Sequence, residues 1–426
     1  MKKRLLTGFF NFLRPIVRFA LRVFYRHMPV SGASLLQKPG PVIYVSNHPN
    51  TLIDPFMVAI HSNRIIHFLA NAGLFDSRFG FWFFSTFFCF PIQRSIDKVS
   101  RQIDNDHSFD RMQEFLTNGG ALFIAAEGGS EVGRYVKPLR TGTARIALNK
   151  AAFLDWQTDL TILPIGLIYE DPARFRSSVW VKVGDPIRVA DYQALHESDA
   201  YQAVRGLTHD IENQLIDLTL HMPDVLEEKL LLRLMTILDN LYPGDFIAVV
   251  KKIKDLQKSL SSQSADDLKG VEGYFDRLEE LEIGDITVQQ CEQGLHRSFG
   301  AMILGFPIFC WGFFNNLLVW ALAELPLKMT DMYPTYHSTV RFLGGFLGVL
   351  LFYPMQYFWV LHHFGLPSAL AYLLSLIPTG IFAAFFVRKW KQWLDLRNFR
   401  KLALEYPDEC RQLQQQRKAI IAHWKL

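Results

Sequence analysis

His48 and Asp54, six positions apart, are the residues best suited to form a general-base pair in this chain. His48 follows the β-rich run 41–45, and Asp54 directly precedes Pro55, where a helical stretch begins. An aspartate N-cap before a proline is a common helix start, and the helix dipole favours its ionised form. An ionised carboxylate beside an imidazole orients the ring for proton abstraction. A structural histidine beside an ordinary helix start explains the same residues, so other motifs must decide.

A glycine turn follows a second expected strand, 121–125. The turn reads Glu127-Gly128-Gly129-Ser130. Consecutive glycines let the backbone approach a ligand, and exposed amides after a strand form an anion-binding nest. The basic residues that follow are Arg134, Lys137, Arg140 and Arg145. The combination indicates a phosphate site, although an ordinary glycine turn with solvated charges accounts for it about as well.

Two further positions are notable. Arg94 comes soon after the aromatic run 81–90. An arginine in this position could bind an anionic partner, although a surface arginine is the default interpretation. The run itself reads as core more readily than as the lining of an acyl channel or a membrane face. Pro164 falls within the expected strand 160–168. Such a proline is confined to a sheet edge or a bulge, and there it could shape a pocket.

These four blocks together resemble the membrane-bound glycerolipid (phospholipid/glycerol) acyltransferase family over residues 36–195. Asn47-His48 with Asp54 is similar to the family's catalytic His–Asp motif, and Arg94 to the arginine that contacts the acyl acceptor. The blocks Glu127-Gly128-Gly129-Ser130 and Pro164 match in order and spacing. Four blocks in order are far more specific than any one of them.

The resemblance implies transfer of a fatty acyl group from acyl-CoA or acyl carrier protein to a hydroxyl of glycerol 3-phosphate or 1-acylglycerol 3-phosphate, in phospholipid synthesis. His48 would remove the hydroxyl proton, and Asp54 would hold the imidazole tautomer. Arg94, with Lys137 or Arg140 as secondary candidates, would bind the acceptor phosphate. The remaining implied substrate-binding positions are Asn47, a candidate oxyanion stabiliser, and Glu127, Gly128, Gly129 and Ser130. No cofactor and no metal are required. Membrane lipids are further expected partners, and nucleic acid is not.

Two departures from the family pattern bear on specificity. Five residues, Pro49 to Ile53, separate His48 from Asp54, where the family usually has four. The five-residue form resembles a subgroup acting on glycerol 3-phosphate and dihydroxyacetone phosphate. Neither spacing places both side chains on one helical face, so the turn must fold back. Ala126 also replaces the usual proline before the glutamate.

The fold class expected for residues 36–195 is α/β, a glycerolipid acyltransferase-like mixed or largely parallel sheet flanked by helices. The strands expected are 42–45, 65–69, 121–125, 160–168 and 179–183. The helices expected are 55–61, 107–117 and 143–150. Ligands favour the loops at strand ends in such sheets.

Four other segments are expected around this domain. Residues 1–35 predict a basic amphipathic helix on a membrane surface, broken near Pro15, because arginines recur every four residues among aromatic side chains. A helix packed on its own domain is the alternative. Residues 196–296 predict a helical extension, 297–390 transmembrane or re-entrant helices, and 391–426 a basic cytoplasmic helical tail. The four scattered cysteines indicate neither a disulfide framework nor a zinc site.

The apolar segments leave the number of crossings open. Residues 298–323 lack charge, and 342–387 carry only His362 and His363 besides neutral side chains, which is enough for three spans. The basic tail and the arginine-rich N-terminus both belong on the cytoplasmic side, which requires an even number. One segment is therefore expected to be re-entrant, with 298–323 a candidate. We expect the inner or plasma membrane, with the catalytic domain on its cytoplasmic face.

Three rival functions fit parts of this pattern. A non-catalytic membrane scaffold that binds lipid would not need His48, and an acyltransferase could act on another lysolipid. A thioesterase or lipid hydrolase would use water as acceptor, but no Gly-x-Ser-x-Gly nucleophile elbow is present in the sequence.

Overall fold

The computed structural model describes residues 2–94, 104–260, 265–292 and 298–426. It divides into two compact units. The sheet unit comprises Met1–His221 and Asp331–Phe342, and the helical unit comprises Met222–Thr330 and Leu343–Leu426. The sheet unit thus includes the N-terminal helix and runs past residue 195, where the sequence predicts the domain to end.

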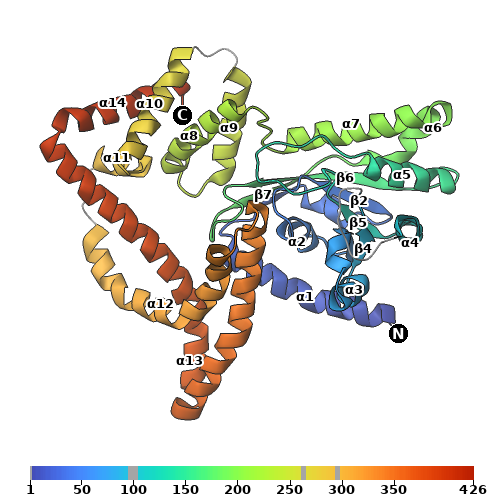
Figure 1. The fold of residues 1–426 in the computed structure, drawn as a ribbon, viewed down its shortest axis with the longest axis horizontal. Coiled ribbons are helices and arrows are strands. Elements are labelled where there is room, and N and C mark those ends of the chain that lie inside the picture. The colour runs from blue at the N-terminus through green and yellow to red at the C-terminus, as the bar shows by residue number, and fades with distance from the viewer. Residues whose placement is uncertain (1, 95–103, 261–264, 293–297) are drawn as a thin grey trace. The chain divides into compact units, whose positions relative to one another are not determined.

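A mixed sheet forms the centre of the sheet unit, with the strand order β1-β7-β6-β2-β5-β3-β4 and β8 paired to β6 (Figure 1). β6 is antiparallel to β7 and β8, and the remaining pairs are parallel. The strands are β1 (Val30–Ser31), β2 (Val42–Ser46), β3 (Ile66–Asn71), β4 (Cys89–Ile92), β5 (Ala121–Ile124), β6 (Thr161–Tyr169), β7 (Val179–Val183) and β8 (Ile187–Arg188). The expected fold class and the five expected strands are confirmed.

Helices cover both faces of this sheet, so both faces of its central strands are buried. Along β2, Val42 and Tyr44 join a core cluster with α1 and α2, whereas Ile43 and Val45 join a second cluster with α4, α5 and α7. The helices of this unit are α1 (Lys2–Phe24), α2 (Ile53–Ala59), α3 (Arg78–Thr86), α4 (Asn105–Thr117), α5 (Gly142–Phe153), α6 (Gln193–Ser198) and α7 (Ala200–Leu218). Such two-sided burial explains the continuous apolar runs of the strands.

The N-terminal helix packs on its own domain. α1 runs unbroken through Pro15, where the sequence predicts a break, and buries Leu21 and Phe24. Arg18 donates to the carbonyl of Ile60 at the end of α2, and Arg14 donates to that of Ser62 at 2.9 Å. These two arginines of α1 therefore cap the C-terminal end of α2. Phe12 and Phe19 stay exposed and leave an aromatic face that suits a membrane surface.

The aromatic run 81–90 differs from the expected core segment. It forms the end of α3 and the start of β4, a strand that the sequence does not predict. Phe90 is buried, but Trp82 is 57% exposed. β4 has only four residues and its burial does not alternate, and the run is uniformly apolar, so hydrophobic periodicity cannot separate helix from strand here.

Pro164 lies in an interior strand, at an irregularity in the pairing of β6. Ile162 pairs with Ile187 and Ile165 with Val183, so three residues, 184–186, face two on β6. Of the two positions that the sequence allows for this proline, a sheet edge or a bulge, the structure shows the bulge.

The helical unit contains α8 (Val225–Leu241), α9 (Phe246–Ser259), α10 (Ala265–Glu280), α11 (Asp285–Glu292), α12 (Ser298–Met329), α13 (His337–Glu405) from residue 343 onward and α14 (Pro407–Trp424). The C-terminal helix packs on the extension, since the buried Arg417 pairs with Asp285 at 2.8 Å. α12 and α13 are long and apolar enough to cross a membrane, and few of their apolar side chains are buried, as in a lipid-facing helix.

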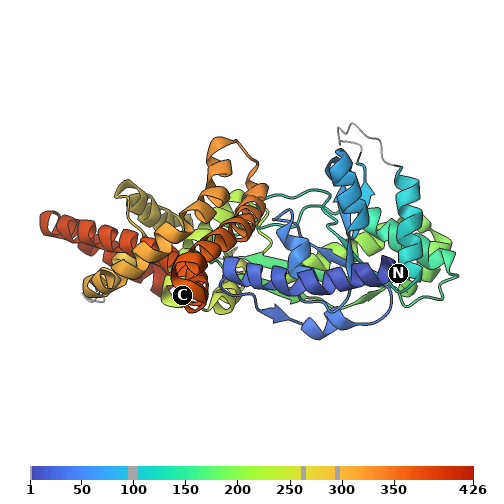
Figure 2. The ribbon, with the colours of Figure 1, turned by 90° about the horizontal axis from the view of Figure 1, so that it is seen from below.

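α13 is kinked at Gly365, where φ is +77°, and so has two arms, 343–364 and 366–405 (Figures 1 and 2). The N-terminal half of α12 contacts the second arm, as Gly305 with Phe386 and Gly312 with Thr379. The C-terminal half contacts the first arm, as Gly348 with Val319. Asn316 in the middle of α12 hydrogen-bonds both arms, through Leu376 and Tyr353. The two ends of α12 therefore face the two open ends of the arms, and its middle lies nearest the kink.

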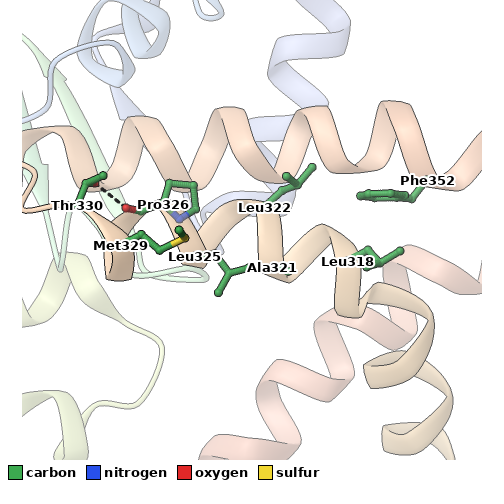
Figure 3. A pocket seen from close by; sticks show the side chains of 8 residues that line it. All are labelled: Leu318, Ala321, Leu322, Leu325, Pro326, Met329, Thr330 and Phe352. Carbon is green, nitrogen blue, oxygen red and sulfur yellow. Dashed lines mark hydrogen bonds between the residues drawn. The ribbon is translucent and has the colours of Figure 1, made fainter.

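An apolar hollow of about 400 Å³ lies between α12 and the first arm of α13 (Figure 3). The lining residues are Leu318, Ala321, Leu322, Leu325, Pro326, Met329, Thr330 and Phe352. The hydroxyl of Thr330 donates to the Pro326 carbonyl at 2.6 Å. The hollow thus suits hydrocarbon and offers no charged group for a phosphate.

Candidate active site

Three of the sequence motifs meet at one edge of the sheet. β4, β3, β5 and β2 are adjacent and parallel, so their carboxyl ends lie together. His48 follows β2, Glu127 follows β5 and Arg94 follows β4. The order of the strands in the sheet, rather than in the chain, therefore brings these side chains into one site.

His48 and Asp54 are directly hydrogen-bonded, since Nδ1 of His48 lies 2.9 Å from Oδ2 of Asp54. The expected fold-back of the five-residue turn is thus present. The Asp54 side chain is fully buried, whereas that of His48 is 16% exposed. An ionised Asp54 can only accept, which assigns the proton to Nδ1 and leaves the lone pair on Nε2. This is the tautomer that a general base requires.

Asp54 does not cap its helix, which corrects the N-cap prediction. α2 begins at Ile53 with Leu52 as its N-cap, and no side chain caps it. The Asp54 carboxylate instead accepts from the backbone N–H of Asn50 at 2.8 Å and from the Tyr169 hydroxyl at 2.7 Å. Burial raises the pKa of Asp54, and the hydrogen bonds from His48, Tyr169 and Asn50 oppose that rise. The sequence gives no sign of Tyr169 as a site residue, since it follows the predicted strand as an ordinary tyrosine.

Asn47 joins the site to strand β6. Its side-chain amide donates to the Leu167 carbonyl at 2.9 Å, and its side-chain oxygen accepts from the Leu167 N–H at 2.8 Å. Both bonds are buried. The Asn47 side chain therefore fixes the start of the turn to the sheet.

The glycine turn encloses the backbone of His48. Glu127 Oε1 accepts from the His48 N–H at 3.3 Å, and the Glu131 N–H donates to the His48 carbonyl at 3.2 Å. Burial raises the pKa of Glu127 to about 8. This carboxyl is therefore largely neutral near pH 7, and a neutral carboxyl does not repel a phosphate.

Arg94 reaches the same turn, where its guanidinium donates to the Gly128 carbonyl. Gly128 has φ +75°, and the Arg140 side chain packs against it. Lys137 pairs with Glu131 at 2.9 Å. Gly129 and Ser130 continue the turn. The structure thus places Arg94, Lys137 and Arg140, the predicted phosphate ligands, around the turn.

The arrangement can take a proton at His48 and balance negative charge nearby with three basic side chains. Within the described ranges, no three His, Cys, Asp or Glu side chains converge as a metal site would require.

Comparisons with known proteins find similarity over part of the chain. Residues 27–168 match the Acyltransferase family. Glycerol-3-phosphate O-acyltransferases 2 and 1 of Saccharomyces cerevisiae are 30% identical over 128 residues and 33% identical over 94 residues. An uncharacterised acyltransferase of Schizosaccharomyces pombe is 30% identical over 131 residues.

These matches cover 22 to 30% of this chain and 12 to 19% of the relatives, so the chain spans less than a fifth of the length of the curated relatives it matches. A solved 1-acyl-sn-glycerophosphate acyltransferase of Thermotoga maritima is 17% identical, with a TM-score of 0.33, over 48% of this chain and 79% of that chain.

Proposed function

We propose that the chain is a glycerolipid acyltransferase, on the basis of its match to the Acyltransferase family over residues 27–168, and that it transfers a fatty acyl group to a hydroxyl of glycerol 3-phosphate. 1-Acylglycerol 3-phosphate is the alternative acceptor, and the donor is acyl-CoA or acyl carrier protein. The hydrogen bond of 2.9 Å between His48 and the buried Asp54 is the observation that carries the proposal. The five-residue turn and the yeast relatives' names favour glycerol 3-phosphate.

In the proposed reaction, Nε2 of His48 takes the proton of the acceptor hydroxyl as its oxygen attacks the thioester carbonyl. The C–O bond forms, the C–S bond breaks, and the imidazolium returns the proton to the leaving thiolate. Asp54 stabilises the imidazolium between these steps. General-base assistance of this kind contributes about 100- to 10,000-fold in rate.

The acceptor phosphate is proposed to bind at the glycine turn. Arg94 would contact it first, with Lys137 and Arg140 adding positive charge. The raised pKa of Glu127 supports this placement, because a protonated carboxyl leaves the positive potential of the turn intact.

Both the proposed chemistry and the apolar helices support attachment to a membrane. The product is a lipid, whereas the thioester donor is dissolved in the cytoplasm. An enzyme held at the cytoplasmic face of the inner or plasma membrane can use both, and α12 and α13 are suited to hold it there.

The test supplies the full chain in phospholipid vesicles with labelled acyl-CoA and an acceptor panel of glycerol 3-phosphate, dihydroxyacetone phosphate, 1-acylglycerol 3-phosphate and glycerol. We expect His48→Ala to lower transfer to glycerol 3-phosphate by about 100-fold or more. The exposed His209, on α7, provides the matched control, and His209→Ala is expected to retain activity. Full activity of His48→Ala would reject the mechanism, and transfer to glycerol alone would reject the phosphate site.

A further inference from the structure

The segment Asp331–Phe342 connects the two apolar helices in the chain, yet it belongs to the sheet unit. It contains the short 3-10 helix Pro334–Tyr336 and the first turns of α13. Nothing in the expected function assigns it a role. Its contacts fall on the turn between His48 and Asp54.

Three of the five residues of that turn are hydrogen-bonded to this segment. Ser338 donates its hydroxyl proton to the side-chain oxygen of Asn50. The hydroxyls of Thr339 and Thr51 lie 2.7 Å apart, and the Leu52 N–H donates to Thr339 at 3.3 Å. Ser338 is fully buried and Asn50 nearly so. Water therefore cannot readily replace the bond between Ser338 and Asn50 if it is lost.

The far end of the segment is anchored in the core. The buried Phe342 ring packs edge-on against Phe24 of α1 and Phe56 of α2, with centroids 6.1 and 6.4 Å apart. Arg341 donates to the Ala173 carbonyl at 2.9 Å. A segment fixed at these points can hold the turn in one position rather than follow its motion.

The turn in turn holds the proton-transfer pair. The Asn50 N–H donates to Asp54 Oδ2 at 2.8 Å, and the same oxygen bonds His48 Nδ1. Ser338 fixes the Asn50 side chain, and Thr339 fixes the next two residues. The placement of Asp54 against His48 thus depends on two hydroxyls about 285 residues away in sequence.

We propose that Asp331–Phe342 is a positioning segment, in which Ser338 and Thr339 hold the turn 49–53 so that Asp54 orients His48. The segment connects α12 to the first arm of α13 in the chain, so the link between the two apolar helices also holds the active-site turn. The family-matched residues 27–168 do not contain it. The proposal rests on the proposed function for its kinetic consequence, but the geometry it assigns to His48 is testable without activity.

The experiment uses the full chain in vesicles with four substitutions: Ser338→Ala, Thr339→Val, Thr339→Ser and Tyr336→Phe. We expect Ser338→Ala and Thr339→Val to lower kcat by about 10- to 100-fold, since a misplacement of about 1 Å can cost 100-fold. KM for acyl-CoA and glycerol 3-phosphate should change by less than about twofold, because Ser338 and Thr339 hydrogen-bond the turn 50–52, whereas the phosphate is proposed to bind at the glycine turn. Thr339→Ser keeps the hydroxyl and restores kcat. Tyr336→Phe changes an exposed side chain of the same segment and serves as the control.

A second measurement is independent of turnover. Diethyl pyrocarbonate is applied to each variant, and the modification rate of His48 is followed by mass spectrometry of its peptide. We expect faster modification in Ser338→Ala and Thr339→Val, because the imidazole is held less firmly by Asp54, and an unchanged rate in Tyr336→Phe and Thr339→Ser. Equal His48 modification rates in all variants would overturn the positioning role, even where their thermal stability differs. An inactive wild type with the expected modification pattern would reject the proposed function alone.

Discussion

Asp54 is fully buried and accepts hydrogen bonds from His48, Asn50 and Tyr169. Burial disfavours the charge of a carboxylate, and each donor favours it. The charge and the position of Asp54 therefore depend on Asn50 and Tyr169 as well as on His48. A lost donor leaves a buried lone pair unsatisfied, which costs about 1–3 kcal/mol, and it also weakens the orientation of His48.

Tyr169→Phe tests this dependence. We expect kcat to fall by about 10-fold, as for the loss of one buried hydrogen bond to the carboxylate. Tyr44→Phe removes another buried hydroxyl, which donates to the Leu36 carbonyl at 2.9 Å, and is expected to lower stability but not kcat. The check is steady-state kinetics beside thermal unfolding for both variants. A similar loss of kcat in both would assign the effect to folding.

Glu127 gives a pH dependence with a definite sign. Burial raises its pKa from 4.5 to about 8, so the folded protein binds this proton more tightly than the unfolded chain does. The resulting stabilisation is full below pH 4.5 and is lost as the pH rises through about 8. Relative to Glu127→Gln, wild type should therefore show a falling thermal midpoint from pH 5 to 9. Parallel midpoints for the two proteins over this range would contradict the buried, protonated state.

At the scale of elements, the parallel strands β2, β5, β3 and β4 place the site, and the loops after them shape it. The glycine turn after β5 combines a left-handed residue with a close arginine contact, since a Cβ on Gly128 would lie 3.0 Å from Cγ of Arg140. The carbonyl of Gly128 also accepts from Arg94. One backbone conformation thus sets the positions of two basic side chains.

Gly128→Ala is expected to raise KM for glycerol 3-phosphate several-fold more than it changes kcat. The left-handed backbone disfavours a Cβ by about 1–2 kcal/mol, and the turn must shift away from Arg140. Gly119→Ala is the matched control, because Gly119 has φ +72° with no neighbour near its Cβ. It should lose stability with KM unchanged. Equal KM values for the two variants would contradict the placement of the phosphate at this turn.

At the scale of the whole molecule, we propose two membrane crossings, which would reconcile three apolar stretches with an even number. α12 approaches the kink of α13 with its middle, so on this proposal it enters and leaves the membrane on one side. The two arms of α13 would then supply the two crossings. The segment Asp331–Phe342 lies with the sheet unit, and the tail lies with the extension that precedes α12.

This topology predicts the labelling of single cysteines in oriented vesicles. In a chain without its four native cysteines, a membrane-impermeant maleimide should reach Tyr336→Cys and Lys425→Cys from the side that carries His48. It should reach Leu366→Cys, beside the kink, only from the opposite side. Labelling of Tyr336→Cys and Lys425→Cys from opposite sides would require a third crossing and would contradict the re-entrant course of α12.

The sequence by itself determined the residue types of the site and the strands that carry them. Both follow from local patterns: apolar runs between turns, and four short blocks in a fixed order. The sequence could not reveal β4, because its aromatic run has no periodicity. Nor could it reveal that Arg18 caps the C-terminal end of α2.

Only the tertiary structure decided which groups hold the His–Asp pair. Tyr169 lies 115 residues from Asp54, and Ser338 lies 288 residues from Asn50. A hydroxyl in a strand or a loop carries no local signal of its partner, because packing and sheet order bring the two together only after the chain has folded.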